Sequence, residues 1–176
     1  MVNLVEQNYL ENKFLYNKIE SDLRKDLDKS IPINHVGSTA IPDMCGKNII
    51  DVLIGAANEK QFKKIADFLV KKCFISSLKS KTDIYQFFAS REGESSCGDI
   101  HIHLVKIGTE RYDEFIILRD YLLNNKEEAM NYSNLKRELV ESGIVDRKEY
   151  KNAKSEYVTK LIGRAKLGTD EHPRKV

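Results

Sequence analysis

The architecture follows from residues 35–54, which read HVGSTAIPDMCGKNIIDVLI. The pattern predicts a strand end, a turn at Gly37 and Ser38, one short helical turn and a second strand over 48–55. Asp51 lies in the apolar run of the second strand, where an ionised carboxylate is costly unless it is paired or binds a cation. Asp51 is therefore the first candidate for a functional residue.

The bulk composition fits one ordinary globular domain. The chain has 176 residues, of which 41% are hydrophobic and 32% charged, and its net charge is +2. This balance gives no strong indication of a nucleic-acid or membrane partner. No apolar run reaches about 18 residues, and the polar first 13 residues do not resemble a signal peptide. We therefore expect a cytoplasmic protein whose partner is a small molecule rather than nucleic acid or a membrane.

Hydrophobic periodicity and capping residues predict the elements of the fold. In order, we expect a helix over 10–27, strands over 31–36 and 48–55 with a turn capped by Ser38 or Thr39 between them, a helix opened by Asn58 and Gln61, strands over 74–78, 84–90 and 99–107, and helices over 110–123, from Asn125 to Gly143 and from Asp146 to just before Gly168. This order predicts an α+β fold, with a mixed sheet, flanking helices and a C-terminal helical bundle. The expected parts are a core over 1–108, a helical region over 109–168 packed on it and a flexible tail over 169–176.

Strict alternation in the last predicted strand places Asp99, His101 and His103 on one face. Carboxylate and imidazole side chains are common metal ligands, and imidazole titrates near neutral pH. The alternative is a half-exposed strand whose polar residues face solvent. A functional role gains support if this strand lies beside the strand that carries Asp51.

Three cations interrupt the apolar stripes of the three C-terminal helices. They are Arg119, Lys136, which lies beside Tyr132, and Lys154. A long cationic side chain at the edge of a stripe often only extends its charge to solvent. One such residue on each of three consecutive helices instead indicates convergence on an anionic group, which could be a phosphate or a carboxylate such as Asp51.

Several motifs resemble, in order, those of the GrpB family, an uncharacterised protein family. They are His35 to Pro42, then Lys47 and Ile49-Ile50-Asp51, His101-Ile102-His103-Leu104, Leu118-Arg119-Asp120-Tyr121-Leu122, Tyr132 with Leu135-Lys136, and Tyr150 with Lys154. The Gly37-Ser38 turn with Asp51 on the following strand also resembles the signature of the nucleotidyltransferase (polymerase β-like) superfamily. The resemblance spans about Phe14 to Ala165 and implies a nucleotidyltransferase-like sheet within 1–108.

The resemblance implies Mg²⁺-dependent transfer of a nucleotidyl group from a nucleoside triphosphate to a small-molecule acceptor. The phosphate-binding residues would be Gly37, Ser38, Thr39, Lys47, Arg119, Tyr132, Lys136 and Lys154. The catalytic residues would be Asp51, His101 and His103, and the metal ligands Asp51, Asp99, His101 and His103. In such enzymes the carboxylates hold Mg²⁺, which neutralises charge and orients the attack on the α-phosphate.

One position departs from the superfamily pattern. A second acid usually follows the first by two residues on the same strand face, and here that position is Leu53. The departure favours the alternative of a non-catalytic protein that binds a nucleotide or a phosphorylated metabolite. A third interpretation is a metal-dependent hydrolase that uses Asp51 with the two histidines.

Overall fold

The computed structural model describes residues 4–77, 81–90, 100–142 and 147–169. Its elements are, in order, β1 (Val5–Glu6), α1 (Tyr9–Arg24), β2 (Ile33–Val36), the 3₁₀ turn η1 (Ser38–Ala40), β3 (Cys45–Gly46), β4 (Ile50–Ala56), α2 (Glu59–Lys71), β5 (Ile75–Ser77), β6 (Tyr85–Ala89), β7 (Ile100–Lys106), α3 (Glu110–Asn124), α4 (Lys126–Glu141) and α5 (Arg147–Thr169). The predicted α+β fold with a mixed sheet and flanking helices is confirmed.

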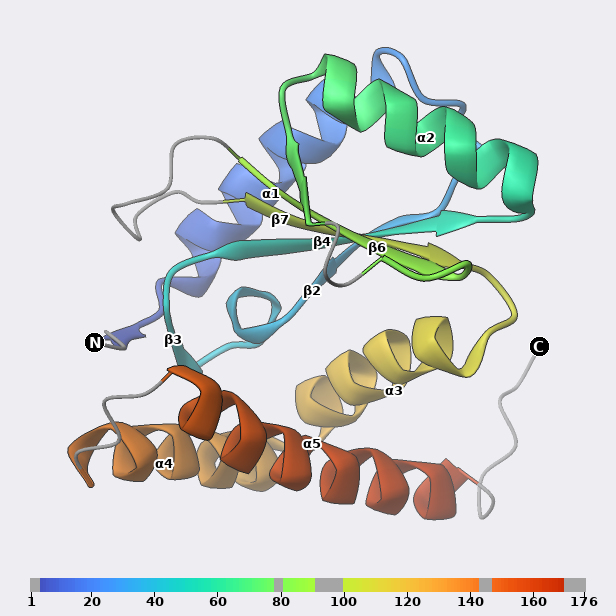
Figure 1. Ribbon diagram of the computed structural model, residues 1–176. Helices are drawn as coiled ribbons and strands as arrows, with labels where there is room; N and C mark the ends of the chain where they lie inside the picture. The colour runs from blue at the N-terminus through green and yellow to red at the C-terminus, as the bar shows by residue number, and fades with distance from the viewer. Residues whose placement is uncertain (1–3, 78–80, 91–99, 143–146, 170–176) are drawn as a thin grey trace.

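The main sheet has the strand order β2-β4-β7-β6-β5 (Figure 1). β4 pairs antiparallel with β2 and parallel with β7, and β6 pairs antiparallel with both β7 and β5. In the central pair, Asp51 lies opposite His101 and Leu53 lies opposite His103. The strand that carries the two histidines is therefore the neighbour of the strand that carries Asp51.

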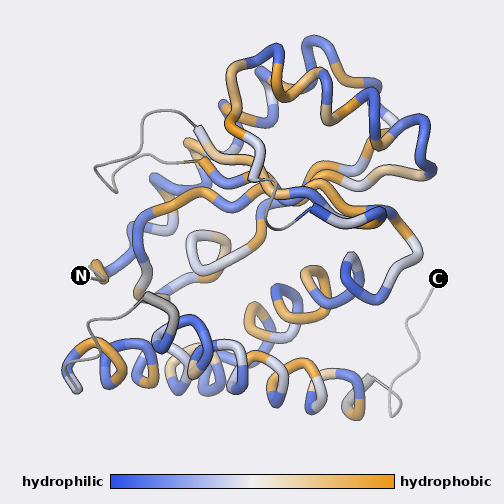
Figure 2. The backbone as a smooth tube through the Cα atoms, viewed as in Figure 1, coloured by the Kyte–Doolittle hydropathy of each residue, from blue (hydrophilic) through white to orange (hydrophobic). Residues whose placement is uncertain are grey.

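The largest apolar core lies between one face of the sheet and helices α1 and α2 (Figure 1). On β4, Ile50, Val52 and Ile54 alternate toward this core and are at most 2% exposed. They pack with Leu23 of α1 and Leu69 of α2. Figure 2 shows apolar stretches along the strands and alternating apolar and polar turns along the helices. The period of two along β4 thus turns Asp51 and Leu53 to the opposite face.

The C-terminal helices lie on that opposite face, with α3 next to the sheet and α4 and α5 beyond it (Figure 1). The loop after η1 anchors them in an apolar cluster, which contains Ala40, Ile41, Met44, Leu122, Ala129, Tyr132 and Leu161. The loop over residues 40–44 therefore connects the sheet to all three helices.

Three local predictions are wrong. Ser38 does not cap the turn, because Gly37 occupies the N-cap position of η1 and no side chain caps it. Asn125 does not cap α4, because its amide instead donates to the Tyr121 carbonyl at 2.8 Å. Helix α5 continues through Gly168, since one glycine near a helix end costs only about 1 kcal/mol.

Other features were either not predicted or lie outside the described residues. Strands β1 and β3 pair antiparallel, but two-residue strands are too short to show a periodicity. Asp99, Asp146, the 91–98 loop and residues 170–176 of the predicted tail fall outside the described ranges. Within those ranges, no helix is long and apolar enough to span a lipid bilayer.

Phe88 provides a test of the core. It is 0% exposed on the face toward α1 and α2, whereas Phe14 on α1 is 63% exposed. We expect Phe88→Ala to lower the free energy of unfolding by about 3–5 kcal/mol, and Phe14→Ala to change it by less than about 0.5 kcal/mol. Urea unfolding measures both, and similar losses would contradict this description of the core.

Candidate functional site

Asp51 and Gly37 are in close contact at the centre of the candidate site. Register places Val36 of β2 opposite Asp51 of β4, so the turn at Gly37 begins directly beside the carboxylate. Gly37 has a φ of 75°, and a Cβ atom added there would lie 2.2 Å from Asp51 Oδ2. Only glycine fits this position, since any side chain would overlap the carboxylate and strain the backbone.

Both histidines of β7 approach the same oxygen of Asp51. His101 Nδ1 and His103 Nε2 each lie 3.4 Å from Asp51 Oδ1. Burial opposes ionisation of Asp51, but the hydrogen bonds from the two imidazoles outweigh it and hold the pKa of the carboxyl well below its usual range. The side chains of Asp51, His101 and His103 are 23%, 30% and 15% exposed, so solvent and small solutes reach this cluster.

His35 and Thr39 support the turn from within. Thr39 Oγ1 donates to the Ile49 carbonyl at 3.1 Å, and the same hydroxyl lies 3.0 Å from His35 Nε2. A hydroxyl has one proton to donate, so His35 must donate from Nε2. Burial lowers the pKa of His35 to about 4, which keeps the ring neutral. Thr39 is 0% exposed, and its hydroxyl holds the turn in place.

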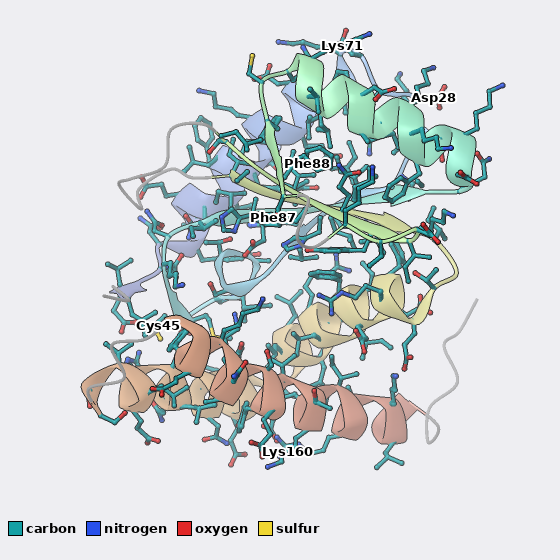
Figure 3. The ribbon with its side chains drawn as sticks, in the orientation of Figure 1. Asp28, Cys45, Lys71, Phe87, Phe88 and Lys160 are labelled. Carbon is teal, nitrogen blue, oxygen red and sulfur yellow. The ribbon has the colours of Figure 1, made fainter. Side chains whose placement is uncertain are left out.

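The loop that follows η1 is fixed on helix α4. The Cys45 N–H donates to Ser133 Oγ at 2.8 Å, and the Cys45 thiol donates to the Ser133 carbonyl at 3.3 Å. Lys136, which is 3% exposed, donates from Nζ to the Cys45 carbonyl. Cys45 is the first residue of β3 and lies beside the layer of C-terminal helices (Figure 3). Lys136 therefore supports this loop in addition to its predicted place beside Tyr132, whose ring centroid is 4.9 Å from Nζ.

The three predicted cations do not form one clamp. Arg119 donates to Asn34 of β2 at 3.2 Å and contacts Asp120 at 2.7 Å, so it is attached to the sheet. Lys154 instead lies close enough to Lys136 for its charge to lower the pKa of that amine. The structure thus gives Arg119 partners of its own, Asn34 and Asp120, whereas Lys136 donates to Cys45 of the loop.

Gly46 precedes Lys47 in the chain and packs against the side chain of Ser38. A Cβ atom at Gly46 would lie 2.3 Å from Ser38 Oγ, so the absence of a side chain lets the two arms of the loop meet. The Lys47 ammonium lies 5.4 Å from the ring centroid of Tyr150 on α5. Tyr150 and Lys154 share a helix face at i and i+4. Lys47 and Lys154 are therefore both associated with the part of α5 around Tyr150.

The residues at the site do not fit the Mg²⁺ centre implied by the resemblance. Mg²⁺ prefers oxygen ligands, but Asp51 is joined here by two imidazoles. Leu53, at the position of the second acid, is 0% exposed and packs with Val36 and Val105. In the part of the chain that the structure describes, no group of three or more His, Cys, Asp or Glu side chains is arranged to hold a metal ion.

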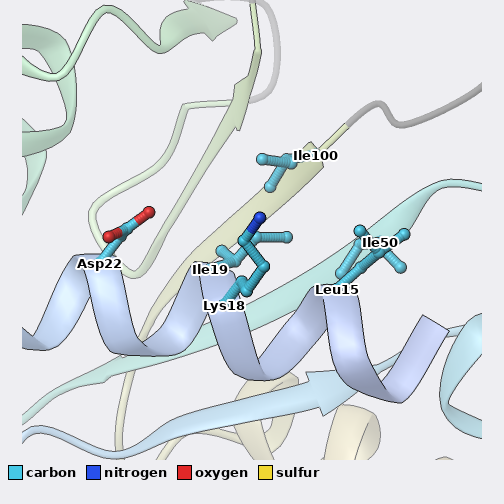
Figure 4. A pocket seen from close by; sticks show the side chains of 6 residues that line it. All are labelled: Leu15, Lys18, Ile19, Asp22, Ile50 and Ile100. Atoms are coloured by element: carbon cyan, nitrogen blue, oxygen red, sulfur yellow. The ribbon is translucent and has the colours of Figure 1, made fainter. Parts of the chain in front are cut away.

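A pocket of about 220 Å³ lies on the other side of the sheet, between α1 and the first residues of β4 and β7 (Figure 4). It is lined by Leu15, Lys18, Ile19, Asp22, Ile50 and Ile100. Asp51 and His101 follow the last two of these residues in the sequence and face the opposite side of the sheet. This pocket is therefore separate from the candidate site.

The family model described as GrpB protein matches residues 2–164. The chain belongs to the GrpB family. The resemblance of its motifs to the GrpB family is thereby confirmed.

Relatives of known sequence or structure cover most of the chain. A glutamate-rich protein GrpB from Alkalihalophilus pseudofirmus is 29% identical over 153 residues, which are 85% of this chain and 88% of that protein. A UPF0157 protein from Halalkalibacterium halodurans is 28% identical over 138 residues, 78% of this chain and 69% of that protein. The crystal structure of the conserved protein GrpB from Enterococcus faecalis superposes with a TM-score of 0.76 at 17% identity, covering 93% of this chain and 96% of that one. The latter match shows a shared fold.

A more distant match is to the Cid1 poly(U) polymerase. Its TM-score is 0.44 at 8% identity, and it covers 76% of this chain and 46% of the polymerase. An overlap this low carries no argument about function.

Tyr85 is a residue of the site that the sequence reading did not single out. Its hydroxyl lies 2.9 Å from His103 Nδ1. Tyr85 and Phe87 alternate on β6, and register sets Phe87 opposite His103. Alternation in the sequence showed a face for each strand, but the pairing of β6 with β7 was needed to bring Tyr85 to the histidine.

Gly37→Ala tests the contact with Asp51. Gly108 is a matched control, because its φ is 78° but nothing lies within 4 Å of an added Cβ. Gly108→Ala should cost about 1–2 kcal/mol of unfolding free energy through backbone strain alone. Gly37→Ala should cost at least about 1 kcal/mol more through overlap with the carboxylate. Equal costs in urea unfolding would show that the contact does not constrain Gly37.

His35 predicts a loss of stability in acid. Its pKa of about 4 in the folded protein lies below the ordinary value of 6.5, so between these values the unfolded chain binds the proton more readily. The contribution of His35 to the free energy of unfolding is complete above pH 6.5 and is lost as the pH falls toward 4. From pH 7 to pH 5 the loss is on the order of 2 kcal/mol.

The control for this prediction is His35→Gln, which keeps an N–H donor for Thr39 and cannot titrate. Urea unfolding at pH 7 and at pH 5 gives the change in free energy of unfolding for both proteins. We expect a smaller change in the variant, and the same pH dependence in both would rule out His35 as the source.

Proposed function

We propose that the protein binds a nucleotide or another phosphorylated small molecule between the 37–47 loop and the C-terminal helices. The observation that supports this most directly is the ammonium of Lys136, which is 3% exposed and donates to the Cys45 carbonyl of this loop. Burial and the charge of Lys154 lower the pKa of Lys136 to about 8. A buried ammonium beside a second cation is unfavourable, and a bound anion would offset that cost.

The surroundings of the two lysines suit a phosphate group. Lys47 adds a third cation from the loop, near Tyr150. The exposed turn at Gly37 lies at the other end of the same loop, beside Asp51. A ligand that meets the lysines with its phosphates could extend toward Asp51 and the two histidines, whose side chains are partly exposed.

Binding is better supported than Mg²⁺-dependent nucleotidyl transfer. That transfer normally uses at least two carboxylates to hold the metal. Leu53 occupies the position of the second carboxylate and is buried in an apolar cluster. A small movement of the backbone there would not bring another carboxylate to the metal position. We therefore propose that ligand binding does not require a divalent metal.

Titration calorimetry with ATP, GTP, CTP and UTP, each with EDTA and again with Mg²⁺, tests the proposal. We expect at least one nucleotide to bind in EDTA. Lys154→Gln should then raise the dissociation constant about tenfold, because it removes one charge-assisted hydrogen bond.

The matched control is Lys160→Gln on the same helix. Lys160 pairs with Glu156 at 2.7 Å and its side chain is 67% exposed, on the outer side of α5 (Figure 3). This variant should bind as the unmodified protein does. If no nucleotide binds to folded protein, or if both variants weaken binding equally, the proposed function is wrong.

A further inference from the structure

A chain of hydrogen bonds crosses three neighbouring strands on the face that carries Asp51. Tyr85 Oη of β6 lies 2.9 Å from His103 Nδ1 of β7, and His103 Nε2 lies 3.4 Å from Asp51 Oδ1 of β4. A hydroxyl, an imidazole and a carboxylate are thus connected in series. A nucleophile within hydrogen-bond distance of a base that is oriented by a third group is the arrangement used in covalent catalysis.

The direction of these hydrogen bonds follows from the chemistry of the groups. Asp51 is ionised and can only accept, so the imidazole of His103 donates to it from Nε2. In a neutral imidazole the other nitrogen then has a lone pair and accepts. Nδ1 therefore accepts the proton of the Tyr85 hydroxyl.

Packing holds the imidazole of His103 in this orientation. Its ring centroid lies 4.7 Å from that of Phe115 and 5.5 Å from that of Phe87. The guanidinium of Arg111 lies 5.3 Å from the centroid of the Tyr85 ring. Burial raises the pKa of Tyr85, and the nearby charge of Arg111 opposes that rise. A phenol of this kind needs an adjacent base to react, and His103 is in position to act as one.

We propose that Tyr85 is a nucleophile that accepts a nucleotidyl group, with His103 as its base and Asp51 as the residue that positions the base. In this step Tyr85 Oη bonds to the α-phosphorus of a nucleoside triphosphate, and the bond from that phosphorus to the departing pyrophosphate breaks. The phenolic proton moves to His103 Nδ1, and Asp51 stabilises the resulting imidazolium. The identity of the electrophile rests on the proposed function, whereas the nucleophile can be tested without it.

The first experiment measures the reactivity of Tyr85 with a small aryl sulfonyl fluoride, which forms a sulfonate ester on activated hydroxyls and releases fluoride. Peptide mass spectrometry follows the rate at each tyrosine. Tyr112 is the internal control, because it is also half-buried but its hydroxyl meets the Asn34 amide at 3.4 Å. Tyr85 should react on the order of 100-fold faster than Tyr112.

The variant His103→Gln tests whether His103 acts as a base for Tyr85 or only packs beside it. The glutamine amide can still donate toward Asp51 but offers no acceptor at the place of Nδ1. We expect labelling of Tyr85 to fall by on the order of 100-fold while labelling of Tyr112 stays unchanged, which also reports that the fold is intact. Equal rates at Tyr85 and Tyr112 in the unmodified protein, or no effect of His103→Gln, would overturn the proposal.

The second experiment incubates the protein with each nucleoside triphosphate used in the titration and analyses intact mass and peptides. We expect a nucleotidyl adduct on Tyr85 that Tyr85→Phe abolishes. Binding without an adduct would overturn the transfer step and leave the proposed function intact. If no nucleotide binds, the proposed function and the transfer step both fail, and the sulfonyl fluoride result alone decides whether Tyr85 is a nucleophile.

Discussion

The contact between the Asp51 carboxylate and Gly37 is the constraint on which the rest of the site depends. A partly buried carboxylate remains ionised only where donors compensate for lost hydration. Here both histidines of β7 approach Oδ1, while Oδ2 occupies the space that a side chain at Gly37 would need. The turn must therefore be made by glycine with a positive φ. That geometry turns Thr39 inward, where its hydroxyl orders His35.

This constraint also couples the sheet to the C-terminal helices. The loop that leaves the Gly37 turn carries Met44 into the apolar cluster of α3, α4 and α5 and presents the backbone of Cys45 to Ser133 and Lys136. A shift of the turn would therefore move the carbonyl to which Lys136 donates. The acidic and cationic parts of the candidate site are linked by one short segment of backbone, although they belong to different layers of the fold.

Most elements of the fold, and the grouping of Asp51 with His101 and His103, could be predicted from the sequence. The reason differs between residues. The Asn58 cap formed as expected, with its side chain accepting from Gln61 N at 2.9 Å, because capping is local. The shared face of His101 and His103 also follows from local alternation. The partners of Lys136 and Tyr85 depend on residues far away in the chain. Periodicity shows which side of an element a residue occupies, but not which element covers that side.

Leu53 shows why the remaining polar groups of the site are arranged as they are. It occupies the same strand face as Asp51 but lies farther under α3, where Val36 and Val105 exclude water. A second carboxylate at that position would lie in this apolar cluster, and burying it unpaired would cost several kcal/mol. The neighbouring strands instead supply Tyr85 and His103, and the His103 ring packs against Phe115 and Phe87. The result is a site with one ionised acid, Asp51, hydrogen-bonded to an imidazole that in turn meets a phenol.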